Sequence, residues 1–527
     1  MTSQQAGSGT GSTGSTGVPD SSGGDSVTPA DDTGAAVSTG TAAVPAAAGG
    51  TASPSTTTGA LTTDAGYRPA GDFSLDVERR SVTNAVQSWF IRLRSGEPGA
   101  LPSILGLVVL AAIFSQVSDR FLSRNNIGNL PGQGAYIAII AMGLVFVLLL
   151  GEIDLSAGTT GGVCAGFAAQ AIFSNGLDKG TSGVLYWSLI VGMLAMVALG
   201  AYLRSITGPI VVALGVVDAL TGVDKNVLGA LFLAIAIGCA IGIFVGWLVA
   251  AVGIPSFIVT LALFLAFQGV LLFALKSQPI GINSYPFWYG LAHNNISPFW
   301  SWVFTISLVL GYFAFTLVKS LGAQAKGLAA DTLQLVVVRA GILAVVGLVI
   351  TYLANQNRNT NVYKLIEGLP WAAAVPITLM IVCTLALTKT TWGRHLVATG
   401  GNEEAARRAG IDVRHIKVTA FTVNSGFAAL GGIFLASNTG GAQLDLGAGN
   451  ILLFAVAAAV IGGTSLFGGR GKPRDAILGA LVIVMIPNGI GLKPNLGVQH
   501  QEVITGLVLL IAASVDALSR RRSVRSR

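Results

Sequence analysis

Long apolar blocks are the feature that most constrains how this chain can fold. They recur from residue 101 almost to the C-terminus, and a block of about 18 to 20 apolar residues is long enough to cross a bilayer as a helix. A helix satisfies its own backbone hydrogen bonds where there is no water. Charged residues make up 10% of the chain, well below the roughly 25% of soluble domains. These features predict an all-α polytopic integral membrane protein.

Thirteen blocks are expected to cross the membrane, within a possible range of 12 to 14 spans. They lie near residues 101–118, 133–150, 157–173, 184–203, 226–251, 255–275, 299–318, 333–354, 370–388, 416–437, 447–465, 476–491 and 500–517. Basic residues flank the first and last blocks and crowd the loop between residues 388 and 417, so the positive-inside rule places both termini and this loop in the cytoplasm. Nine blocks precede this loop, and an odd number cannot join two cytoplasmic points. Either 157–173 is a re-entrant half-helix, or 206–221 is an additional short crossing.

The chain is expected to have four parts. Residues 1–72 are rich in Gly, Ser, Thr and Ala and have too few apolar side chains to fold, which predicts a disordered tail. Residues 73–98 form an amphipathic juxtamembrane segment, 99–518 the transmembrane domain and 519–527 a basic cytoplasmic tail. The net charge of +7 lies mainly in the expected cytoplasmic regions, where it suits anionic lipid headgroups. The lipid membrane is therefore an expected partner, and nucleic acid is not.

Cysteine, histidine and glycine patterns give no sign of a metal or nucleotide site. Cys164, Cys239 and Cys383 stand singly inside apolar blocks, which is typical of small packing residues. The four histidines form no pair at zinc spacing. The segment 468–473 (GGRGKP) has proline where an ATP-binding loop needs Ser or Thr. We expect this chain to bind no metal and no cofactor and to hydrolyse no ATP itself.

A short capped helix is predicted in the basic loop at about residues 389–416. Asn402 is a good N-cap, acidic residues fill the first turn, arginines fill the last turn, and Gly410 ends the helix. On physical grounds alone this is equally an ordinary interfacial loop helix. The helix and its flanks comprise Gly400, Gly401, Asn402, Glu403, Glu404, Ala405, Ala406, Arg407, Arg408 and Gly410.

Three motifs together resemble one family. Residues 400–413 (GGNEEAARRAGIDV) resemble the cytoplasmic coupling-helix loop of ABC importer permeases of the ribose, xylose and branched-chain amino acid class. Residues 151–158 (GEIDLSAG) and 462–471 (GGTSLFGGRG) resemble two further segments of the sugar permeases. Extra apolar material around 184–221 and 333–354 makes the chain most similar to the xylose-type members. The residues of the late motif are Gly462, Gly463, Thr464, Ser465, Gly468 and Gly469.

The resemblance implies a permease subunit of an ATP-driven sugar importer, with D-xylose or a related monosaccharide as the cargo. It implies a separate cytoplasmic ABC ATPase that hydrolyses ATP, an extracytoplasmic sugar-binding protein, a homodimer, and the plasma membrane (cell inner membrane) of a prokaryote. One alternative is an ion-coupled secondary sugar transporter. Another is an ABC permease for a different small solute, such as branched-chain amino acids or nucleosides.

Two of the motifs leave their roles open. Glu152, Asp154 and Ser156 follow an apolar block, where a carboxylate is costly unless it reaches water, a partner or a cavity. They line the translocation path or steady a broken helix beside it, or they cap the next helix, or they couple transport to protons. The late motif is either a tight cytoplasmic turn or a flexible connection that transmits motion.

Overall fold

The computed structural model describes residues 101–328, 330–359 and 365–493, together with residues 87, 495, 497, 499–508, 510 and 514. All of these belong to the second of two units into which the chain divides, Ser74–Arg527. The predicted tails of residues 1–72 and 519–527 lie outside the described residues, as does nearly all of the juxtamembrane segment. The last expected span is described only in part.

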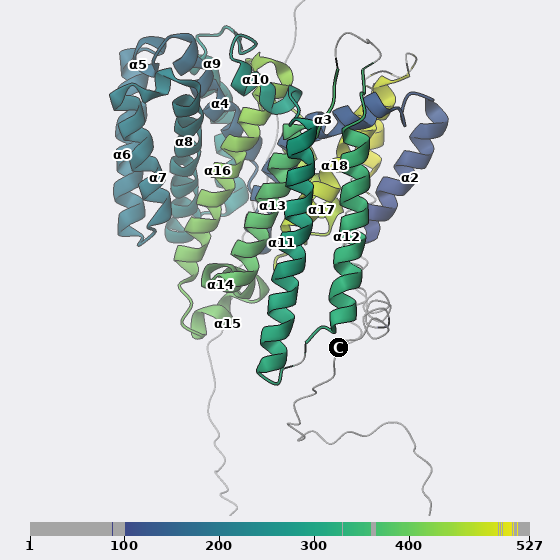
Figure 1. The fold of residues 1–527 in the computed structure, drawn as a ribbon. Coiled ribbons are helices and arrows are strands. Elements are labelled where there is room, and N and C mark those ends of the chain that lie inside the picture. The colour runs from purple at the N-terminus through teal and green to yellow at the C-terminus, as the bar shows by residue number, and fades with distance from the viewer. Residues whose placement is uncertain are drawn as a thin grey trace, which may run out of the picture. The chain divides into compact units, whose positions relative to one another are not determined.

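The described residues fold almost entirely into helices (Figure 1). The α-helices are α2 (Leu101–Val117), α3 (Arg124–Leu149), α4 (Ala157–Phe173), α5 (Leu177–Gly180), α6 (Gly183–Tyr202), α7 (Thr207–Thr221), α8 (Val227–Trp247), α9 (Ser256–Ala274), α10 (Pro286–His293), α11 (Pro298–Ala325), α12 (Leu333–Ala354), α13 (Trp371–Lys389), α14 (Thr391–Gly401), α15 (Glu403–Arg408), α16 (Val413–Thr439), α17 (Ile451–Gly462) and α18 (Pro473–Gly491). A 3-10 turn, η1 (Val223–Lys225), precedes α8, and a π-turn, η2 (Leu248–Val252), extends it. The strands β1 (Ile280–Gly281) and β2 (Gly441–Ala442) pair antiparallel, with Ile280 opposite Ala442.

Most of these helices have the length and composition of membrane spans. Within the described residues, nine helices are long and apolar enough to cross a membrane, and α7, α17 and most of α2 are shorter apolar helices. The prediction of an all-α polytopic membrane protein is confirmed. Figure 1 shows α5 and α10 at one end of the bundle and α14 and α15 at the opposite end, here called the α15 end.

Helix α7 removes the conflict in the first half of the chain. It is a 15-residue helix that packs beside α6 and α8, and it corresponds to the additional short crossing considered for 206–221. Helix α4 is continuous over 17 residues. With α7 added to the nine spans expected before the basic loop, their number becomes even, which the predicted cytoplasmic placement of the N-terminus and of this loop requires.

The expected span at 447–465 is wrong at its start. Helix α17 begins only at Ile451 and has 12 residues, or about 18 Å of helix, against a hydrocarbon core of about 30 Å. Gly447 and Gly449 adopt φ values of 82° and 65°, a left-handed conformation that glycine adopts readily and that interrupts a helix. The irregular segment before α17 instead packs against Gly158 and Gly162 of α4.

Helix α16 lies at the centre of the packing. It contacts α3, α4 and α8, and small residues let the backbones approach closely. The closest approach is between Gly432 of α16 and Gly161 of α4, where a Cβ on Gly432 would overlap the Gly161 backbone. Cys164, Cys239 and Cys383 are free and buried, as expected for packing residues. The core therefore combines close backbone contacts with packed apolar side chains.

Candidate functional site

The three sequence motifs meet at the α15 end of the bundle. The Gly469 N–H donates a hydrogen bond of 2.9 Å to the Leu149 carbonyl. Gly400, at the end of α14, packs so closely on the same carbonyl that a Cβ there would overlap it. Gly468 lies against both Gly400 and Gly151. These five residues, here called the motif junction, join three parts of the sequence that lie far apart in the chain.

Backbone geometry explains the glycines of the motif junction. Gly151, Gly468 and Gly469 have φ values of 77°, 86° and 74°, a region that residues with a Cβ rarely adopt. Gly400 has no such φ value, but it faces backbone rather than a movable side chain. A Cβ at Gly400 or Gly468 would press on the backbone of a neighbouring segment, whereas at Gly151 the positive φ is the constraint.

Helix α15 has the caps predicted from the sequence. The Asn402 side chain accepts a hydrogen bond of 2.9 Å from the Ala405 N–H, and Gly410 follows the helix with φ 82°. Ion pairs at i,i+4 join its acidic first turn to its basic last turn, Glu403 to Arg407 at 3.0 Å and Glu404 to Arg408 at 3.2 Å. The helix and its caps are confirmed, whereas its role stays a prediction.

Helix α14 was not predicted. Its N-cap, Thr390, accepts a hydrogen bond of 3.0 Å from the Gly393 N–H, and the helix continues through Gly400 to Gly401. Thr390 two residues after the predicted span is the signal that could have revealed it, since threonine is a favoured N-cap. The glycine pair therefore closes a helix that contacts α13 and α16.

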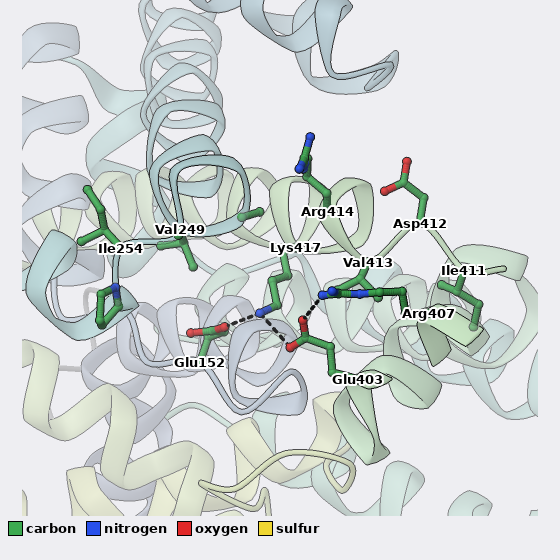
Figure 2. Close-up of a pocket in the computed structure, with 13 residues that line it drawn as sticks. Glu152, Val249, Ile254, Glu403, Arg407, Ile411, Asp412, Val413, Arg414 and Lys417 are labelled. Carbon is green, nitrogen blue, oxygen red and sulfur yellow. Dashed lines mark hydrogen bonds and ion pairs between the residues drawn. The ribbon is translucent and has the colours of Figure 1, made fainter. Parts of the chain in front are cut away.

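Lys417 connects two of the three motifs, as Figure 2 shows. Its Nζ lies 2.8 Å from Glu152 Oε1 and 3.0 Å from Glu403 Oε2. Lys417 and Glu152 are 14% and 18% exposed, so this contact is largely shielded from water. The sequence identifies Lys417 only as a basic loop residue, because no local pattern relates it to a carboxylate in another motif.

Asp154 holds the start of α4 and the middle of α16 together. It is buried, and its Oδ1 accepts hydrogen bonds from the Ser156 N–H at 2.8 Å and the Ser156 Oγ at 2.7 Å. The Asn424 side chain donates to Oδ2 at 2.5 Å. Desolvation raises the pKa of this carboxyl, and the three hydrogen bonds oppose the rise.

These contacts support the interpretation that the Asp154 region steadies a helix start. Ser156 stands at the N-cap position of α4, but its hydroxyl donates to Asp154 and makes no capping bond. Ser156 is therefore the predicted cap by position alone, and Asp154 holds this residue in place without bonding an N–H of the first turn of α4. The role of Glu152, Asp154 and Ser156 in a translocation path stays a prediction.

A cavity of about 640 Å³ opens beside Lys417. Figure 2 shows charged side chains along one side of it, among them Arg407 and Arg414. The turn between η2 and α9 lines the other side. Glu152 and Glu403 both line the cavity, whereas Asp154 does not. The space lies at the contact between α15 and the rest of the bundle.

The late motif forms a compact turn after α17. Gly463 ends this helix with φ 119°, and the Ser465 N–H donates to the Arg470 carbonyl at 2.9 Å. Gly462 packs on the backbone of Asp475 in α18. The geometry agrees with a tight turn, and a role in transmitting motion stays a prediction. Thr464 is buried within the same turn.

Sequence comparison identifies the family. The sequence model of a family described as "Branched-chain amino acid transport system / permease component" matches residues 205–513, more than half of the chain. The chain belongs to this permease family. The predicted family is thereby confirmed, and the permease is a multi-pass membrane protein.

Sequence alignments with curated relatives extend over most of this permease. The xylose transport system permease protein of Escherichia coli K12 is 30% identical over 80% of this chain and 92% of its own length. Its Haemophilus influenzae counterpart is 29% identical over 80% of this chain and 96% of its own length. The ribose import permease protein of Escherichia coli K12 is 27% identical over 79% and 92%. No solved structure matches the permease.

Proposed function

We propose that the permease forms the translocation pathway of an ATP-driven importer for D-xylose or a related monosaccharide. Relatives named for xylose and ribose transport align with 80% and 79% of this chain, which supports a sugar as the cargo. The motif junction supports a mechanical role for the three motifs, because it packs three separate segments backbone to backbone.

The position of α15 carries the coupling part of the proposal. Glu404 and Arg408 are 62% and 80% exposed, while Glu403, beside them, is bound to Lys417. The helix therefore presents a charged face away from the bundle and is fixed to the bundle on its other face. A separate cytoplasmic ABC ATPase is the proposed partner of the outward face, and it supplies the ATP hydrolysis.

The proposed assembly contains two copies of the permease in the plasma membrane of a prokaryote, with both termini in the cytoplasm. An extracytoplasmic sugar-binding protein delivers the sugar at the α10 end and determines most of the specificity. The segment from Glu152 to Ser156 lies beside the sugar path in this proposal, where its buried hydrogen bond to Asn424 of α16 steadies the break between α3 and α4.

Co-purification tests the partner. The double variant Glu404→Arg/Arg408→Glu reverses the exposed face of α15 while leaving its i,i+4 ion pair possible. We expect an ABC ATPase to co-purify with the solubilised wild type and to be lost from this variant, as judged by mass spectrometry. The matched control, Asp331→Arg/Arg339→Asp, reverses a 2.7 Å ion pair of the α11–α12 hairpin and should retain the ATPase.

Sugar uptake into vesicles tests the energy source. We expect uptake of labelled D-xylose to require ATP and to survive collapse of the ion gradients. If no ATPase associates with the wild type and uptake follows an ion gradient instead, the permease is a secondary transporter. If a different solute competes for uptake and D-xylose does not, the family assignment stands and the proposed cargo is wrong.

A further inference from the structure

Lys417 is shared by two carboxylates that belong to different segments of the fold. Glu403 is the first residue of α15, and Glu152 lies in the connection between α3 and α4. The Lys417 Nζ is within 3.0 Å of both. Ion pairs that are mostly shielded from water are screened less by salt than exposed ones. Lys417 is therefore placed to transmit a displacement of α15 into the bundle.

The connection between α3 and α4 is fastened to α16 at two points. Glu152 forms an ion pair with Lys417, and Asp154 accepts a hydrogen bond from Asn424. Asn424 lies two helical turns further along the same face of α16. Of these two contacts, only the one at Lys417 also involves α15, through Glu403. Ala406 is the single buried residue among the six of α15, so the attachment of this helix depends strongly on polar contacts.

The Lys417–Glu403 contact can break without leaving a charge unpaired. Glu403 uses Oε2 for Lys417 and Oε1 for Arg407, at 3.0 Å in each case. If the two separate, Glu403 keeps Arg407 and Lys417 keeps Glu152. Breaking a shielded ion pair is costly chiefly when a charge is left without a partner. The cavity of about 640 Å³ beside these residues provides room for α15 to move.

We propose that Lys417 is a positioning residue that couples α15 to the α3–α4 connection, and that its ion pair with Glu403 breaks and re-forms in each transport cycle. The inference rests on the proposed function, because it takes α15 as the helix that contacts the ATPase. Lys417 touches neither sugar nor nucleotide in this proposal. It acts through Glu152, which in turn is two residues from Asp154.

The test measures sugar uptake and ATP hydrolysis together, in the permease–ATPase complex reconstituted in vesicles. Lys417→Met should keep ATP hydrolysis while the sugar moved per ATP falls by about five- to tenfold, within the usual range for coupling between sites. Lys417→Arg should restore much of the ratio, because arginine can contact both carboxylates. A residue that only stabilises the fold would lower both activities in proportion.

A second variant, Glu152→Gln, removes the same link and so keeps the test decisive if Lys417→Met fails to fold. Glu152→Gln leaves Lys417 paired with Glu403, so we expect the complex to assemble and the sugar-to-ATP ratio to fall as in Lys417→Met. In the double variant Lys417→Met/Glu152→Gln the sugar-to-ATP ratio should fall no further than in either single variant, since both substitutions remove the same link. The matched control is Arg339→Met, which removes an ion pair of the α11–α12 hairpin and should leave the ratio unchanged.

The outcomes separate this inference from the proposed function. If the ATPase co-purifies with the wild type and with both variants, and the sugar-to-ATP ratio stays at the wild-type value, Lys417 does not couple the two parts. Lys417 is likewise not a coupling residue if uptake and hydrolysis decline in proportion. If no ATPase associates with the wild type, the proposed function itself is wrong.

Discussion

Helix α3 and the α11–α12 hairpin are alike in apolar character but opposite in burial. Both are long and apolar enough to cross a membrane. In the most apolar stretch of α3, 89% of the residues are buried, against 11% in α11 and 17% in α12. Hydropathy therefore predicts that a helix spans the membrane, but it does not predict whether that helix packs inside the chain. The exposed faces of the hairpin are left for lipid or for another subunit.

The largest expected contrast comes from adding the same side chain to each region. Gly432→Leu places a side chain against the backbone of Gly161, which cannot move aside, so we expect a loss of about 3 kcal/mol or more in stability, at or above the upper end of overpacking costs. A Cβ at Gly341 in α12 meets no atom within 4 Å, so Gly341→Leu should be neutral, or stabilising by up to about 1 kcal/mol through helix propensity. Thermal unfolding in detergent compares the two. Equal effects would show that the central packing is looser than described.

A smaller loss is expected from the buried polar contact of the core. Asn424→Leu removes the donor to Asp154 Oδ2 and should cost about 1–3 kcal/mol, because this carboxyl oxygen is left buried without a partner. The double variant Asp154→Ala/Asn424→Leu should cost less than the sum of the two single variants. Denaturant unfolding of all four proteins completes the cycle. Strict additivity would argue against a direct contact.

The smallest expected loss lies in the hairpin. Thr305→Val removes the 2.5 Å hydrogen bond between the Thr305 and Thr351 hydroxyls. This bond joins α11 to α12, as the Asp154–Asn424 bond joins two segments in the core. We expect a cost of about 0.6 kcal/mol, typical of hydrogen bonds between membrane helices, with sugar uptake unchanged. A loss as large as that of Asn424→Leu would mean that the hairpin contributes to the core.

The sequence predicted α15 well because capping is local. Asn402 bonds the backbone three residues away, and Gly410 ends the helix through its own backbone conformation. Hydropathy likewise located most of the spans. It gave the wrong start for α17, because Gly447 and Gly449 interrupt the helix inside an apolar block. It missed α14, an 11-residue helix that mixes polar, charged and apolar residues and is too short for a membrane span.

The contacts within the candidate site were not predictable in the same way. Asp154 and Asn424 are 270 residues apart, and neither residue type indicates its partner. In the sequence, Lys417 is only a marker of membrane topology. Its position between Glu152 and Glu403 depends on how α15 and the end of α3 pack against α16.

By itself the sequence determined that this chain is an all-α membrane protein, where most of its spans lie, and that a capped helix stands in its basic loop. These properties depend on apolar length and on hydrogen bonds between near neighbours. Only the tertiary structure decided that the three motifs form one junction and that Lys417 joins two of them. The physical reason is that ion pairs and backbone contacts act over a few ångströms, and only folding brings residues hundreds of positions apart within that range.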